Sequence, residues 1–186
     1  MITLFFDTET TGLPDWKSPS GADHQPHMTQ FAGALFRDDD HVLASVNLMV
    51  RPDGWTIPAE LQELAGITDA DAEKYGQSEL VVFGIAAQMM QRADLIVAYN
   101  TPFDMRIMRI AAKRYADDAI ADVLKESKTE CAMRQAAKII GGKWPKLGEA
   151  YQHFFNQPLV GAHNAMADVM ACRRIWMHMR DMAEPG

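Results

Sequence analysis

The sequence has few cysteines, no long apolar run and no surplus of basic residues. Its two cysteines, Cys131 and Cys172, lie far apart without metal-type spacing, which indicates buried thiols in a reducing compartment. No apolar run reaches the roughly 18 residues that a membrane span requires. The first residues also lack the basic segment of a signal peptide. We therefore expect a cytoplasmic protein that makes no membrane contact.

The charged residues carry a formal net charge of −7, from 18 basic and 25 acidic side chains. Proteins that bind nucleic acids usually have a basic surface, because cations must neutralise the phosphates. The acidic surplus therefore argues against long, tight, non-specific binding to duplexes. It remains compatible with a nucleic-acid ligand if some of the acids hold divalent cations, since bound ions make a cleft locally positive.

The pattern of hydrophobic residues predicts one α/β domain over residues 1–186, a length that fits one sizeable core. The predicted strands are 2–6, 29–37, 42–50 and 95–98, and the predicted helices are 58–64, 78–92, 101–116, 131–140, 146–155 and 164–182. Residues 14–28, which contain three prolines, indicate a surface loop. The acidic run Asp38, Asp39 and Asp40 is more typical of a solvated turn between strands than of a metal site.

Asp7 and Glu9 are two residues apart at the end of the first predicted strand. Side chains at this spacing share one face of a strand, so both carboxylates can reach one metal ion. Hard divalent cations prefer such oxygen ligands. In isolation, an Asp-x-Glu pair is more often solvated surface. The turn that follows contains Gly12, which permits close approach of a ligand, although a plain capped turn is the alternative.

Asp104 lies in the first turn of the helix predicted at 101–116. An acid there offsets the helix dipole, and the same position can also hold a carboxylate at the edge of a cleft. Asn100 and Phe103 flank it. An amide can bind a phosphate or a base, and an aromatic ring can stack on a base, although Phe103 could equally belong to the core.

His163 and Asp168 lie at the start of the last predicted helix. Their five-residue spacing places them on one site only if His163 is on the incoming loop. An imidazole has a pKa of about 6.5, which suits a general base near neutral pH. A histidine at a helix start is usually polar surface. The joint order of four acids and one histidine nevertheless indicates two-metal hydrolysis of a phosphodiester.

Three motifs, at residues 5–14, 99–105 and 163–168, together resemble the DEDDh branch of the 3′→5′ exonuclease family. This branch includes the proofreading exonuclease subunit of bacterial replicative DNA polymerase and stand-alone relatives. The tyrosine branch would place a tyrosine at Asn164. The resemblance covers residues 2–178 and implies a ribonuclease H-like fold, with a five-stranded mixed sheet flanked by helices and the first motif on the central strand. One departure is the run Gln30-Phe31-Ala32-Gly33 on the second predicted strand, where the family often has an acidic residue.

The resemblance implies release of nucleoside 5′-monophosphates from the 3′ end of single-stranded DNA, with two divalent cations, Mg²⁺ or Mn²⁺. The implied metal ligands, which are also catalytic residues, are Asp7, Glu9, Asp104 and Asp168. His163 is the implied general base. The implied substrate contacts are Thr10, Thr11, Gly12, Leu13, Asn100, Phe103 and His163, with Leu13 wedged against the terminal base.

Several alternatives remain open. The enzyme could trim RNA, act only as a proofreading subunit with a polymerase or repair partner, or cleave small nucleotides, and the sequence leaves its oligomeric state open. Two groups of basic residues could follow a strand, namely Arg106, Arg109, Lys113 and Arg114, and then Lys138, Lys143 and Lys146 around Trp144. A solvated helix face is the preferred interpretation of both groups.

Overall fold

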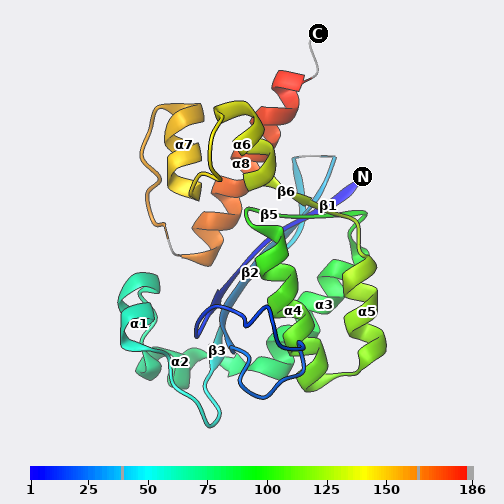
Figure 1. The fold of residues 1–186 in the computed structure, drawn as a ribbon, viewed down its shortest axis with the longest axis vertical. Helices are drawn as coiled ribbons and strands as arrows, with labels where there is room; N and C mark the ends of the chain where they lie inside the picture. The colour runs from blue at the N-terminus through cyan, green and yellow to red at the C-terminus, as the bar shows by residue number, and fades with distance from the viewer. Residues whose placement is uncertain (39, 163, 184–186) are drawn as a thin grey trace.

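The computed structural model describes residues 1–38, 40–162 and 164–183. Within these residues, one mixed sheet has six strands in the order β4-β3-β2-β1-β5-β6 (Figure 1). The strands are β1 (Ile2–Thr10), β2 (Met28–Arg37), β3 (His41–Arg51), β4 (Gln77–Ser78), β5 (Leu95–Ala98) and β6 (Thr129–Cys131). β1 pairs antiparallel with β2 and parallel with β5, so the strand that carries the first motif is internal, as predicted.

Helices cover both faces of this sheet. They are α1 (Ala59–Ala65), α2 (Asp69–Tyr75), α3 (Glu79–Arg92), α4 (Thr101–Tyr115), α5 (Asp118–Glu126), α6 (Ala132–Ile140), α7 (Leu147–Phe155) and α8 (Ala165–Ala183). One core lies between the sheet and α3, α4 and α5, and a second lies between the sheet and α6, α7 and α8 (Figure 1). None of the helices in the described ranges is long and apolar enough to cross a membrane.

The alternation of side chains along β1 assigns its residues to these two cores. Leu4 and Phe6 belong to the core under α3 and α4, whereas Phe5 belongs to the other and meets Trp176 of α8, with ring centroids 5.3 Å apart. Because neighbouring side chains of a strand point to opposite faces, Asp7 and Glu9 lie on the face of Phe5. This alternation directs both acids towards the α8 layer.

The structure confirms the α/β class with a mixed sheet flanked by helices, but corrects the number of strands. The sheet has six strands rather than five, because the two-residue β4 pairs with Val50 and Arg51 at the edge of β3. So short a strand has no hydrophobic period for the sequence to reveal. The sequence also missed α2, α5 and β6. Asp38 and Asp40 lie in the predicted turn, and Asp39 lies outside the described residues.

The loop predicted at 14–28 is held by more side-chain hydrogen bonds than its polar composition suggested. Gln25 is buried, and its side chain accepts a hydrogen bond from the Asp15 N–H at 3.1 Å and donates to the Pro19 carbonyl at 3.0 Å. Arg106 of α4 donates to the carbonyls of Asp15 and Ser18. The loop is therefore tied to α4. Of the two free cysteines, Cys172 is buried, as predicted, and Cys131 is half-buried.

Candidate active site

Three of the predicted metal ligands meet on the α8 side of the sheet. Asp7 and Glu9 come from β1, and Asp168 comes from the first turn of α8. One carboxylate oxygen of each residue lies within 4.8 Å of the other two. The two-residue spacing on β1 supplies the first pair, and the crossing of α8 over the same face supplies the third acid. We refer to these three residues as the acidic triad.

Asp104 approaches β1 from the opposite layer. It lies in the first turn of α4, is 3% exposed, and its Oδ1 accepts two hydrogen bonds from Thr8. The Thr8 N–H donates at 3.0 Å and the Thr8 hydroxyl donates at 2.8 Å. Thr8 lies between Asp7 and Glu9 in the sequence, and its side chain points to the other face. Asp104 is thus fixed beside the strand of the triad, across the sheet from Asp168.

Burial and like charge make the carboxylates hard to ionise. Burial, followed by the charges of Asp104, Glu9 and Asp168, raises the pKa of Asp7 well above its ordinary value. Burial and the charges of Asp168 and Asp104 raise the pKa of Glu9 to about 7. Burial also raises the pKa of Asp104 to about 7, against the opposite effect of the Thr8 hydrogen bonds. A cation among these groups would favour their ionised forms.

The start of α8 is anchored by side chains that the sequence analysis did not assign. The Asn164 side chain accepts a hydrogen bond from the Ala167 N–H at 3.3 Å, as a helix N-cap does. Gln30 of β2 accepts from the Ala165 N–H at 3.3 Å and donates to Asn47 at 2.8 Å. Gln30, which belongs to the run that departs from the family pattern, therefore helps to position the helix that carries Asp168. His163, the predicted general base, lies outside the described residues.

Hydrogen bonds hold the turn of residues 10–13, which follows the β1 part of the acidic triad. The Thr10 hydroxyl donates to the Gly12 carbonyl at 2.8 Å. Thr11 and His27 exchange two hydrogen bonds, from the Thr11 N–H at 2.9 Å and from the His27 N–H to the Thr11 hydroxyl at 3.0 Å. A Cβ on Gly12 would meet no atom within 4 Å, and the Leu13 side chain is 83% exposed. This apolar side chain therefore remains accessible to a ligand.

The other two predicted substrate contacts lie at the start of α4. Asn100 precedes the helix and is exposed, and its carbonyl accepts from the Phe103 N–H at 2.8 Å. Its side chain caps no backbone group among the described residues. The Phe103 ring is half-buried and packs against the core below α4. The amide is therefore available to a ligand, whereas part of the ring serves packing.

The comparison with protein families agrees with these motifs. Residues 4–176 match the family model RNase_T, described as exonuclease. The chain belongs to this exonuclease family. The exonuclease family predicted from the three motifs is thereby confirmed.

Solved structures of exonuclease I share the fold of this exonuclease. One has a TM-score of 0.75 at 20% identity and covers 97% of this chain and 41% of that chain. The zinc-bound complex of E. coli exonuclease I with single-stranded DNA has a TM-score of 0.75 at 22% identity and covers 99% and 41%. A complex of E. coli exonuclease I with a dT13 oligonucleotide has a TM-score of 0.72 at 21% identity. This match covers 96% of the present chain and 40% of exonuclease I. The chain thus spans about two-fifths of exonuclease I. No curated protein sequence matches it significantly.

Three of the four basic residues predicted after Asp104 hold the exonuclease fold together. Arg106 binds loop carbonyls, Lys113 pairs with Asp118, and Arg114 donates to the Gln25 carbonyl at 2.9 Å. Arg109 has no such partner in the described part of the chain. Around the second group, Trp144 is 66% exposed, and binding of a strand by the lysines there stays an untested alternative to a solvated helix face.

A buried network around Glu79 holds the His27 ring, and the His27 backbone is hydrogen-bonded to Thr11 in the turn of residues 10–13. The Glu79 carboxylate accepts hydrogen bonds from the Met28 N–H at 2.8 Å and the Tyr115 hydroxyl at 2.7 Å, and it contacts His27 Nδ1 at 2.7 Å. Arg114 lies 3.4 Å away. Burial favours a higher pKa for Glu79, but these hydrogen bonds lower its pKa below the ordinary value. No sequence pattern predicts this network, because an acid in a first helical turn usually faces solvent.

Proposed function

We propose that this exonuclease hydrolyses single-stranded DNA from the 3′ end and releases nucleoside 5′-monophosphates, with two divalent cations, Mg²⁺ or Mn²⁺. The observation that carries the proposal is the acidic triad, Asp7, Glu9 and Asp168, beside the buried Asp104. Single-stranded DNA as the substrate is supported by the exonuclease I structures that contain such oligonucleotides. The proposal treats residues 1–186 as one exonuclease domain.

The residues present fit a site for hard divalent cations. All the donors are carboxylate oxygens, which Mg²⁺ and Mn²⁺ prefer over softer ligands. Burial and the charges of Asp168 and Asp104 raise the pKa of Glu9 to about 7, and burial raises the pKa of Asp104 to about 7, so a divalent cation bound here would favour the ionised forms of both. Asp7, Glu9 and Asp168 would hold one ion, and Asp7 and Asp104 would hold the second. When bound, the ions would supply charge stabilisation and an activated water for attack on the phosphodiester.

The chain's own side chains would orient the substrate and move a proton. The backbone of Thr10 and Thr11 would contact the terminal nucleotide, and the exposed Leu13 would wedge against its base. Asn100 and Phe103 would line the other side of the strand, from the start of α4. His163 would accept a proton from the attacking water. Replacement of His163 by alanine should lower kcat by orders of magnitude and leave the fold intact.

The test is a time course of digestion with 5′-labelled single-stranded DNA and matched RNA, in Mg²⁺, Mn²⁺ or EDTA. We expect a ladder that shrinks from the 3′ end in the presence of metal and is absent with Asp7→Ala. Glu60→Ala, which changes an exposed acid in the first turn of α1, is the matched control and should digest normally. If the folded protein supplied with metal digests neither oligomer, the proposal is wrong.

The same assay separates the alternatives. Faster digestion of the RNA would identify an exoribonuclease, and cleavage of a dinucleotide but not of the oligomers would identify a small-nucleotide phosphodiesterase. Activity that requires an added polymerase would identify a partner-dependent proofreading subunit. The cytoplasmic location and a polymerase or repair partner stay predictions from the sequence.

A further inference from the structure

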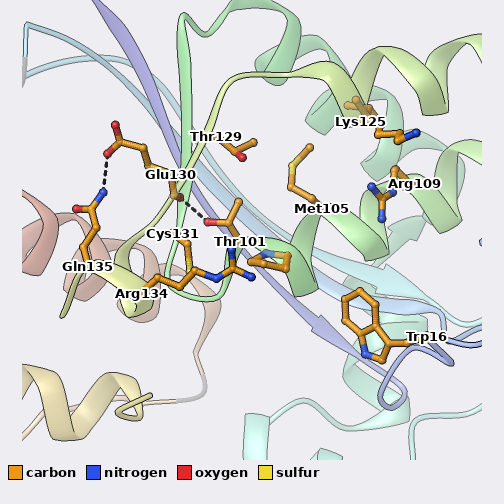
Figure 2. Close-up of a pocket in the computed structure, with 12 residues that line it drawn as sticks. Trp16, Thr101, Met105, Arg109, Lys125, Thr129, Glu130, Cys131, Arg134 and Gln135 are labelled. Carbon is orange, nitrogen blue, oxygen red and sulfur yellow. Dashed lines mark hydrogen bonds between the residues drawn. The ribbon is translucent and has the colours of Figure 1, made fainter. Parts of the chain in front are cut away.

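A pocket of about 420 Å³ lies next to the candidate active site, between α4, α5 and the segment from β6 to α6 (Figure 2). Thr101, Met105 and Arg109, spaced four residues apart, give one face of α4 to this pocket. Asp104 belongs to the same first turn of α4 but lies on a different face. The pocket therefore begins within one helical turn of a proposed metal ligand.

Three cations from three different helices line the pocket. They are Arg109 of α4, Lys125 of α5 and Arg134 of α6. None of the three makes an ion pair or a side-chain hydrogen bond within the described ranges 1–38, 40–162 and 164–183. Burial and the neighbouring charge of Arg106 lower the pKa of Arg109, so its charge is poorly compensated. In a chain with a net charge of −7, this concentration of unpaired cations indicates an anionic ligand.

The acid that borders the pocket does not neutralise these cations. The Glu130 carboxylate accepts hydrogen bonds from the Gln135 amide at 2.9 Å and from the Trp176 indole N–H at 2.8 Å. Figure 2 shows this carboxylate directed to Gln135, away from Arg109 and Lys125. The Glu130 carbonyl accepts from the Thr101 hydroxyl at 2.5 Å. The carboxylate and the backbone carbonyl of Glu130 thus both accept hydrogen bonds from within the fold.

The basic lining continues into an adjoining hollow of about 240 Å³. This hollow shares Arg109 and Lys125 with the pocket and adds Arg106 and Lys113, with Asp122 as the acid on its wall. We call the pocket and the hollow together the α4–α5 groove. Its length matters, because cations distributed over two adjoining hollows can contact more than one phosphate.

An aromatic side chain stands where the groove meets the loop of residues 14–28. Trp16 is 56% exposed and lines the pocket beside Arg109 (Figure 2). The guanidinium of Arg106 lies 5.8 Å from the centre of its ring, and the same arginine binds the carbonyls of Asp15 and Ser18. Trp16 is therefore held on a fixed loop, three residues after Leu13. Cations beside an aromatic platform are typical of single-strand binding.

We propose that the α4–α5 groove holds the backbone phosphates of the substrate strand on the 5′ side of its terminal nucleotide, with one base stacked on Trp16. The inference rests on the proposed exonuclease function and adds the path of the strand. Arg109, Lys125 and Arg134 recognise phosphodiester groups, which DNA and RNA share. The spread of these cations over three helices favours a strand over a free nucleotide.

The test compares the triple variant Arg109→Gln, Lys125→Gln, Arg134→Gln with Lys128→Gln, which changes an exposed lysine that lines neither hollow. Binding of 5′-labelled 15-mers of DNA and RNA is measured by fluorescence anisotropy in EDTA, across a salt series. We expect the triple variant to raise Kd by roughly tenfold or more at low salt and to reduce the salt slope by about 0.7 per cation removed. Lys128→Gln should match the wild type.

Two further arms make the outcome specific. Trp16→Ala should weaken binding of the 15-mer by roughly tenfold at every salt concentration, because stacking is lost without a change in charge. With metal, the triple variant should raise KM for the 15-mer and leave KM for a dinucleotide unchanged. These results would support a strand path, and a difference between the DNA and RNA arms would identify the preferred sugar.

Failure of the groove and failure of the proposed function give different results. If the wild type digests the 15-mer and a folded triple variant keeps its Kd and salt slope, the groove is not the strand path and the exonuclease stands. If the triple variant loses binding but the wild type digests nothing, the groove binds a strand and the proposed function is wrong. Equal temperatures of thermal unfolding for the wild type and the triple variant would exclude misfolding as the cause of any loss of binding.

Discussion

Two buried acidic centres lie close to the turn of residues 10–13, and their electrostatics are opposite. In the acidic triad, carboxylates face other carboxylates, and burial and like charge raise the pKa values of Asp7 and Glu9. Glu79 is more deeply buried than these acids, at 5% exposed, but hydrogen-bond donors surround it and lower its pKa. Burial alone therefore does not identify a site. The direction of the pKa shift separates a centre in which like charges face one another from one in which hydrogen-bond donors compensate the charge.

The two centres are connected through the backbone. Glu79 holds the His27 ring, and the His27 backbone exchanges two hydrogen bonds with Thr11. Thr11 belongs to the turn that follows Asp7 and Glu9 along the chain. The Glu79 network thus fixes the turn beside the acidic triad and holds the proposed substrate contacts of that turn next to the carboxylates.

Asp7→Asn should have the largest effect, because we expect it to lower activity and to raise stability. It removes the acid that is common to both proposed metal positions, and we expect activity to fall by at least about a thousandfold. The same change removes repulsion from the triad, so the protein without metal should become more stable at pH 8. Digestion assays and thermal unfolding in EDTA measure the two effects. Lower stability of the variant would contradict the account of the triad.

Glu79→Ala should have the opposite stability effect. It leaves Arg114, His27 and the Tyr115 hydroxyl without their shared acceptor, and breaking a buried charge network typically costs about 3–5 kcal/mol. Urea unfolding at pH 7 measures this change. Glu60→Ala, an exposed acid in the first turn of another helix, is the control and should change the free energy of unfolding by less than about 0.5 kcal/mol. Equal effects from both substitutions would reject the structural role of Glu79.

The acids Glu9 and Asp104 on one side and Glu79 on the other should change stability with pH in opposite directions. The pKa values of Glu9 and Asp104 are about 7 in the folded protein, against ordinary values of 4.5 and 3.8. Between those limits the folded state binds more protons than the unfolded state, so the free energy of unfolding falls as pH rises. Glu79 acts oppositely, and its stabilising contribution is lost as pH falls below 4.5.

Urea unfolding in EDTA at pH 5, 6, 7 and 8 measures this dependence. We expect a loss of roughly 1–3 kcal/mol between pH 5 and 7, with little further change at pH 8. Saturating Mg²⁺ should abolish the loss, because a bound cation favours the ionised carboxylates. A free energy that rises from pH 5 to 7 in EDTA would show that the acids are ionised in the folded protein at pH 5.

The sequence predicted the elements that have a clear hydrophobic period, and it singled out the three carboxylates that the structure brings together in the acidic triad. α3, α4 and α8 begin and end within two residues of their predicted limits. β4 and β6 have two and three residues, too few for any period. The supporting residues escaped prediction because their partners are distant in sequence. Glu79 binds Met28 across 51 positions, and Gln30 binds Ala165 across 135. No local pattern encodes such pairs.

The smallest expected effect concerns Thr8, which connects the two layers of the candidate site. Thr8→Val keeps the N–H bond to Asp104 and removes the hydroxyl bond. Because both bonds lower the pKa of Asp104, the loss of one should raise that pKa and move the acidic limb of the pH profile of kcat/KM upward by roughly 0.5–1 pH unit.

Thr3→Val is the control for Thr8→Val, because Thr3 is a buried threonine of the same strand that lies away from the acids. It should leave the acidic limb in place. If Thr8→Val also leaves the limb unchanged, ionisation of Asp104 does not limit the reaction. The limb would then belong to another group, such as Glu9, Asp7 or the proposed general base His163, and Asp104 would serve to position β1 against α4. A shifted limb would instead show that the α4 layer, and not the triad alone, sets the pH at which the exonuclease works.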